Sequence, residues 1–135
     1  MPKYQATIYG HKEEQFNIWS HGLGFVASVL GTVLLLARAL DMSDPTYAVS
    51  AAVYGASLLT LYAASTLYHS AKKPKLRNRL NIFDHAAIYI LIAGTYTPFC
   101  LITLAGKVGW ILFACVWSFA VAGVILKLFF TGRYD

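Results

Sequence analysis

The chain has 135 residues, of which 58% are hydrophobic and 13% are charged, and its formal net charge is +5. Soluble domains usually carry about 25% charged residues, so the composition argues against a soluble globular protein. The positive charge is concentrated between apolar segments, which favours membrane lipids as partners and argues against nucleic acid.

Four long apolar runs predict four transmembrane helices, at about 20–40, 46–69, 82–104 and 108–130. Each is close to the roughly 20 residues that a helix needs to cross a bilayer core. None alternates in the way that barrel strands do. We therefore expect an all-α integral membrane protein, with residues 1–19 as an N-terminal segment and residues 1–135 as one membrane domain.

Two features of these runs bear on helix shape and packing. Gly24, Ser28 and Thr32 repeat every four residues in the first run, and small residues at this spacing let helices approach closely in lipid. In the third run, Pro98 removes a backbone hydrogen bond and should kink the helix.

The short segment between the second and third runs is strongly basic, with Lys72, Lys73, Lys75, Arg77 and Arg79. Short loops rich in Lys and Arg stay in the cytoplasm. The segment between the first two runs is acidic. These charges predict a multi-pass protein of the cell membrane (inner or plasma membrane), with its N-terminus in the cytoplasm.

Polar side chains collect at the predicted cytoplasmic ends of three helices. They are Glu14, Asn17 and His21 in the first, Ser65 and His69 in the second, and Asp84 in the third. The first three are spaced i, i+3, i+7 and lie on one helical face. Ionisable residues at membrane depth are costly and usually functional, so their convergence indicates a site.

Each residue also has a purely structural interpretation. His69 could be an interfacial residue that reaches toward lipid headgroups, and Ser65 could bond to the carbonyl four residues earlier. Asp84, which opens the third predicted helix, could be a cap or a partner of the helix dipole. Its neighbour His85 points about 100° away on a helix and is interpreted as structural.

The functional interpretation is a metal site. An imidazole is a zinc ligand, and a nearby carboxylate can manage the proton of an attacking water. By this chemistry His69 is the ligand, with Asp84 and His21 as helpers, and Ser65 could donate a hydrogen bond to substrate. A catalytic zinc uses three protein ligands, and the spacing here supplies one persuasive ligand.

Three segments together carry a family resemblance: EEQFNIWSHG (Glu13–Gly22), STLYHS (Ser65–Ser70) and FDHAAIYILIAGTYTPF (Phe83–Phe99). They resemble the hemolysin III family, which is grouped with the progestin and adipoQ receptors and, more distantly, with alkaline ceramidases. The resemblance covers the chain from Glu13 to Asp135. Members have seven transmembrane helices, a cytoplasmic N-terminus and a zinc ion near the cytoplasmic side.

The resemblance implies a role for each site residue. His69 matches a zinc ligand, Asp84 the residue that holds the water activated by the metal, and Ser65 a supporting group. The first-helix motif, whose residues complete the pocket, matches Glu14, Asn17 and His21. The family's other zinc ligands form an H-x3-H motif in the last helix, and this sequence contains none.

These matches lead to an expectation about the whole protein. We expect this chain to be the N-terminal part of a seven-helix protein, without its C-terminal helices. The expected function is that of a zinc-dependent intramembrane hydrolase acting on a lipid amide, with a pore-forming protein or a receptor-like signalling protein as alternatives. Alone, the chain should bind zinc weakly or not at all, and its unpartnered helix faces should favour a homo-oligomer.

The predicted orientation can be tested by cysteine labelling in intact cells. With Lys75→Cys in the basic segment, we expect no reaction with a membrane-impermeant maleimide until the membrane is opened, because the segment should face the cytoplasm. Efficient labelling from outside would contradict the orientation.

Overall fold

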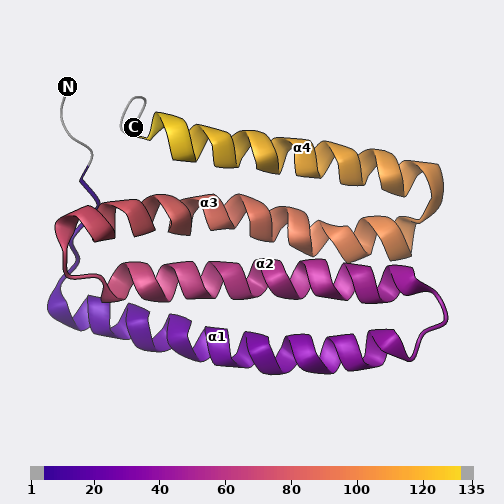
Figure 1. Ribbon diagram of the computed structural model, residues 1–135, viewed down its shortest axis with the longest axis horizontal. Coiled ribbons are helices and arrows are strands. Elements are labelled where there is room, and N and C mark those ends of the chain that lie inside the picture. Colours follow the sequence, from indigo (N-terminus) through magenta and orange to yellow (C-terminus); the bar gives the residue numbers. More distant parts are fainter. Residues whose placement is uncertain (1–4, 132–135) are drawn as a thin grey trace.

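The computed structural model describes residues 5–131, which form an all-helical structure without strands (Figure 1). Its elements are α1 (His11–Leu40), α2 (Pro45–Ser70), α3 (Pro74–Pro98), the π-helical segment η1 (Phe99–Leu104) and α4 (Gly106–Phe130). Four helical segments, with α3 and η1 counted as one, are long and apolar enough to cross a membrane. The predicted fold class is confirmed.

The helices run alternately up and down and lie side by side in chain order (Figure 1). α2 packs against α1 and α3, and α4 packs against α3 and η1. Within residues 5–131, the backbones of α1 and α4 do not approach each other. The helices therefore form an open row, and many large apolar side chains are exposed on it, among them Phe16, Leu34, Phe119 and Phe129. Such exposure suits a chain surrounded by lipid.

Two helices begin well before the apolar runs that predicted them. α1 begins at His11 and α3 at Pro74, whereas the predicted spans begin near residues 20 and 82. An apolar run marks the part of a helix that crosses hydrocarbon, and polar residues can extend the same helix beyond it. Much of the basic segment is therefore the start of α3, and Asp84 lies inside α3 rather than opening it.

Local signals account for two of the helix starts. The Asp44 carboxylate caps α2 by accepting a hydrogen bond from the Thr46 backbone N–H at 2.8 Å. Hydrogen bonding from Thr46, through its side chain and then its backbone N–H, lowers the pKa of the Asp44 carboxyl group. Pro45 is the first residue of α2, and Pro74 is the first residue of α3. At this position the missing proline N–H breaks no helical hydrogen bond, and the fixed φ of proline favours the helix.

The third span is irregular at Pro98, but it is not a simple kink. α3 ends there and continues as the six-residue π-helical segment η1. Pro98 cannot donate to the carbonyl of Gly94 and would crowd it in a regular α-helix, and π-helical turns inside α-helices accommodate such disruptions. The chain then reverses through Ala105 and Gly106, both with positive φ, into α4.

Small residues allow close packing between neighbouring helices. Gly55 of α2 receives the Thr32 side chain of α1, so part of the small-residue repeat lies at this interface. Gly94 of α3 is buried against Ser57 of α2, and a Cβ atom added at Gly94 would overlap the serine side chain. This contact also fixes the register of the antiparallel α2 and α3.

We expect Gly94→Ala to destabilise the chain by roughly 1–3 kcal/mol, the usual cost of overpacking. Gly31→Ala is the matched control, because a Cβ atom there meets nothing within 4 Å and both substitutions gain similar helix propensity. Thermal unfolding in detergent, followed by circular dichroism, measures the difference. Equal stabilities of the two variants would contradict the close α2–α3 packing.

Candidate functional site

Polar side chains meet at one end of the row of helices, where α1 begins, α2 ends and α3 begins (Figure 1). We call this the α2–α3 end. The extended segment before α1 also lies here, because the Ala6 backbone N–H donates to the Asn78 side chain of α3 at 2.9 Å. Three helices and this segment therefore contribute to one site.

Glu14 lies at the centre of the site and binds two side chains from different helices. Its Oε2 accepts a hydrogen bond from Nδ1 of His69 in α2 at 2.7 Å. Its Oε1 forms an ion pair with the guanidinium group of Arg77 in α3. The exposed fractions of the Glu14, His69 and Arg77 side chains are 15%, 8% and 10%. The cluster is thus a mostly buried charged site, in which each charge has a partner.

The guanidinium group of Arg77 also contacts backbone carbonyl groups and an aromatic ring. Its Nη2 donates to the Thr7 carbonyl oxygen at 2.9 Å, and its Nη1 lies 3.5 Å from the carbonyl oxygens of Tyr68 and Ala71. The guanidinium carbon also lies 4.6 Å from the centroid of the Tyr68 ring, in the geometry of a cation–π contact. The Tyr68 hydroxyl donates to the same Thr7 carbonyl at 3.1 Å. Arg77 therefore ties the N-terminal segment to α2 and α3.

A second polar pair lies beside the first. Nδ1 of His21 in α1 is 2.6 Å from Oγ of Ser65 in α2, and the rings of His21 and His69 meet edge to face with centroids 5.8 Å apart. Ser65 is buried, and its hydroxyl is paired with the histidine instead of with its own helix. The structure thus brings together four of the six predicted residues: Glu14, His21, Ser65 and His69.

The other two predicted residues lie near this layer without a hydrogen bond to it. Asp84 is half-buried in α3, and the register that sets Gly94 beside Ser57 places it level with Leu67, between Ser65 and His69. Its interior position excludes the capping role. Asn17 is half-buried on α1, between Glu14 and His21 in sequence. A catalytic role for Asp84 and a pocket role for Asn17 stay predictions.

His85, next to Asp84, bonds within its own helix, and its structural interpretation stays a prediction. Its Nδ1 lies 2.7 Å from the backbone carbonyl oxygen of Asn81, one turn earlier in α3. A carbonyl only accepts hydrogen bonds, so Nδ1 of His85 carries the proton.

A cavity of about 540 Å³ opens at the α2–α3 end; its lining includes Tyr9, His11, Glu14, His69, Lys72 and Arg77. Glu14 and His69 thus face open space, and four further cationic or ionisable side chains surround it. Ser65, Asp84, His21 and Asn17 do not line this cavity, so only two of the six predicted site residues, Glu14 and His69, face it.

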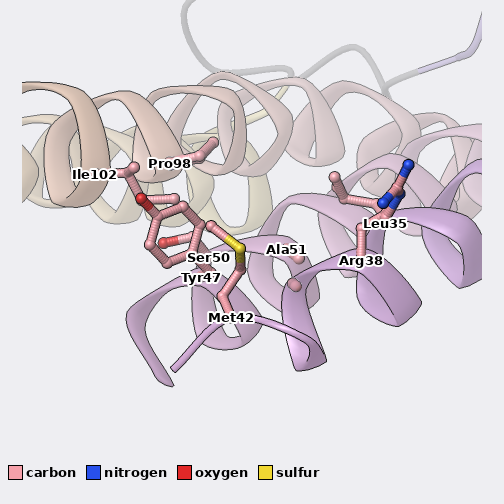
Figure 2. Close-up of a pocket in the computed structure, with 9 residues that line it drawn as sticks. Leu35, Arg38, Met42, Tyr47, Ser50, Ala51, Pro98 and Ile102 are labelled. Carbon is pink, nitrogen blue, oxygen red and sulfur yellow. The ribbon is translucent and has the colours of Figure 1, made fainter. Parts of the chain in front are cut away.

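The opposite end of the helices has a different character. A cavity of about 220 Å³ lies there, between the end of α1, the start of α2 and the segment around Pro98 (Figure 2). Its lining is mainly apolar, with Leu35, Met42, Ala51 and Ile102, and Arg38 contributes the one charged side chain. Groups suited to acid–base or metal chemistry are therefore concentrated at the α2–α3 end.

Sequence reasoning missed Arg77 as a site residue, because it is one of five basic residues in the segment that indicated orientation. Burial distinguishes Arg77 from the other four: Arg77 is buried, whereas Lys72, Lys73, Lys75 and Arg79 are all exposed. No feature of the segment alone marks this difference, which depends on the partner carboxylate in α1.

The residues fit one position of a metal site. Metal-ligating histidines usually donate their second ring N–H to a carboxylate or carbonyl oxygen, and His69 does so to Glu14. Residues 5–131 contain no group of three or more His, Cys, Asp or Glu side chains placed to hold a metal ion together. The described part of the chain thus provides one oriented imidazole, short of the three protein ligands of a catalytic zinc.

The fold and the site together define a multi-pass, all-helical membrane protein with a buried polar site at one end of its helices. The chain belongs to the haemolysin-III-related family, whose sequence profile matches residues 9–134. The family resemblance inferred from the sequence motifs is therefore confirmed.

Three relatives illustrate the similarity. The chain is 46% identical over 123 residues to hemolysin-3 of Bacillus cereus, which covers 91% of this chain and 56% of the relative. It is 44% identical to the hemolysin-3 homolog of Bacillus subtilis (strain 168), in a match that covers 91% of this chain and 58% of the relative. It is 29% identical to the monocyte to macrophage differentiation factor of Homo sapiens, in a match that covers 98% of this chain and 55% of the relative.

The chain thus spans little more than half the length of the curated relatives it matches. No solved structure matches it.

We expect Arg77→Met to destabilise the chain by about 3–5 kcal/mol, because removing one partner of a buried ion pair leaves the other charge uncompensated. Arg79→Met is the matched control: this exposed arginine lies in the same helix, and its loss should change stability by no more than about 0.5 kcal/mol. Unfolding of the detergent-solubilised chain by SDS titration measures both. A small effect at Arg77 would contradict the burial of the pair.

Proposed function

We propose that this chain carries part of the site of a zinc-dependent membrane hydrolase that cleaves an amide bond in a lipid. The observation that supports this most directly is the hydrogen bond of 2.7 Å between His69 Nδ1 and Glu14 Oε2, which is typical of a histidine that ligates a metal. In this proposal the N-terminus is cytoplasmic and the site opens toward the inner surface of the cell membrane.

Each residue then has a defined task. His69 is the zinc ligand contributed by this chain, through Nε2. Zinc, when bound, polarises a carbonyl group and lowers the pKa of a water molecule. Asp84 accepts the proton of the attacking water. In this proposal the hydroxyl of Ser65, whose Oγ lies 2.6 Å from Nδ1 of His21, donates a hydrogen bond to the substrate, as an oxyanion-stabilising group does.

A lipid substrate suits the position of the site. The α2–α3 end lies where apolar spans meet the basic residues Lys72, Lys73, Lys75 and Arg79, the arrangement expected at the headgroup level of a membrane. A lipid can reach this depth from the bilayer with its amide near the polar layer. The ionisable side chains of the site gather at one end of the helices, whereas the buried polar side chains farther along them, such as Ser50, Ser57 and Thr97, are neutral; this favours a site over a pore.

Zinc quantification tests the proposal. We expect the purified 135-residue chain alone to retain little zinc, because one imidazole leaves the metal short of three protein ligands. Co-expression with the part of the Bacillus cereus relative that the chain does not match should yield a complex with about one zinc per complex, because a catalytic site holds a single ion. This complex should also cleave a fluorescent N-acyl lipid amide in mixed micelles.

In the complex, His69→Ala should remove both the zinc and the cleavage, whereas Glu13→Ala, at an exposed residue that does not line the cavity, should remove neither. A co-purified complex without zinc would contradict the proposal, and so would zinc that survives His69→Ala.

A further inference from the structure

The hydrogen bond between Glu14 and His69 determines which ring nitrogen of His69 is free. Arg77 forms an ion pair with the same carboxylate, which keeps Glu14 ionised. An ionised carboxylate only accepts hydrogen bonds, so Nδ1 of His69 must carry the proton at the contact of 2.7 Å. In a neutral imidazole, Nε2 then holds the only available lone pair. Within residues 5–131, Nε2 of His69 has no hydrogen-bond partner.

The guanidinium group of Arg77, which pairs with Glu14, is itself held in place. Arg77 donates to the Thr7 carbonyl oxygen at 2.9 Å and lies over the Tyr68 ring, so its guanidinium has little freedom to follow a displaced Glu14. The Tyr68 ring also packs against the His69 ring, with centroids 4.6 Å apart. Both the donor to Glu14 and the imidazole that Glu14 binds are therefore confined.

We infer that Glu14 and Arg77 are positioning residues that hold His69 in the Nδ1–H tautomer, with the Nε2 lone pair open to a ligand. In water the neutral histidine side chain favours the opposite tautomer, with the proton on Nε2, so the protein selects the less common form. That the ligand of Nε2 is a metal ion rests on the proposed function, whereas the tautomer itself follows from the contacts of Glu14.

This arrangement makes Glu14→Gln an informative substitution. The carboxamide has one oxygen and one NH₂ group, and Arg77, which only donates, selects the oxygen. The NH₂ group is then left facing Nδ1 of His69 and requires a lone pair there. The proton of His69 should consequently move to Nε2, the nitrogen that was open.

Nitrogen-15 NMR of the histidine rings measures the tautomer directly, because protonated and unprotonated ring nitrogens differ widely in chemical shift. The full chain is labelled with ¹⁵N-histidine in detergent micelles, without metal, at a pH where imidazoles are neutral. His69→Gln assigns the signals of His69. His85 is an internal reference, since its Nδ1 donates to the Asn81 carbonyl oxygen at 2.7 Å and should keep its proton in every variant.

We expect the Nδ1–H form of His69 in the wild-type chain and in Glu13→Gln, where an exposed neighbouring glutamate undergoes the same chemical change. We expect the Nε2–H form in Glu14→Gln. An Nε2–H form in the wild-type chain would overturn the inference, whatever the stability of the variants. So would an Nδ1–H form that persists in Glu14→Gln while His85 shows that the fold is retained. Neither result depends on zinc, so a complex without zinc would remove the proposed hydrolase but not the positioning of His69.

Discussion

The buried ion pair between Glu14 and Arg77 is the interaction on which the α2–α3 end depends. The backbones of α1 and α3 do not approach each other, so this pair links two helices that are separated by α2. The carboxylate also binds His69 of α2, and one side chain therefore joins three helices. Burying an unpaired charge costs free energy. Each member of the Glu14–Arg77 pair therefore lowers the cost of burying the other.

The link explains how the polar layer can stabilise the helices and, in the proposed function, also serve as a site. Arg77 is held by backbone carbonyls and by Tyr68, so the structural role falls mainly on the arginine and its surroundings. Glu14 is held by Arg77 and in turn fixes the orientation of the His69 ring through its hydrogen bond. His69 faces the cavity. Preorganised groups of this kind support binding and catalysis, because little reorganisation is needed when a ligand arrives. The opposite end, with its small apolar cavity, has no comparable network among its lining residues.

The sequence predicts the spans well and their ends poorly, for a physical reason. Apolar runs are set by the thickness of the bilayer core, so four spanning helices follow from them directly. The true starts at His11 and Pro74 depend on polar residues that continue a helix outside the core, and the apolar pattern carries no information about them. The apolar pattern consequently predicts Asp84 at the start of the third helix, whereas it lies in the interior of α3.

The candidate site was predictable where one helix brings its residues together. The spacing of Glu14 and His21 on α1, and of Ser65 and His69 on α2, follows from helical geometry, and the structure brings these four residues into one layer. The pairings between helices were not predictable, because they depend on register and on depth. The burial of Arg77 among exposed basic neighbours is the clearest example.

A double-mutant cycle between Glu14 and Arg77 tests the central claim most directly. The unfolding free energies of the wild-type chain, Glu14→Met, Arg77→Met and the double variant are measured under one set of detergent conditions. If the pair holds the α2–α3 end together, the two substitutions are non-additive, with a coupling energy of about 1–3 kcal/mol, in the range of residues that share one network. Additivity to within about 0.5 kcal/mol, as is usual for distant sites, would contradict the account.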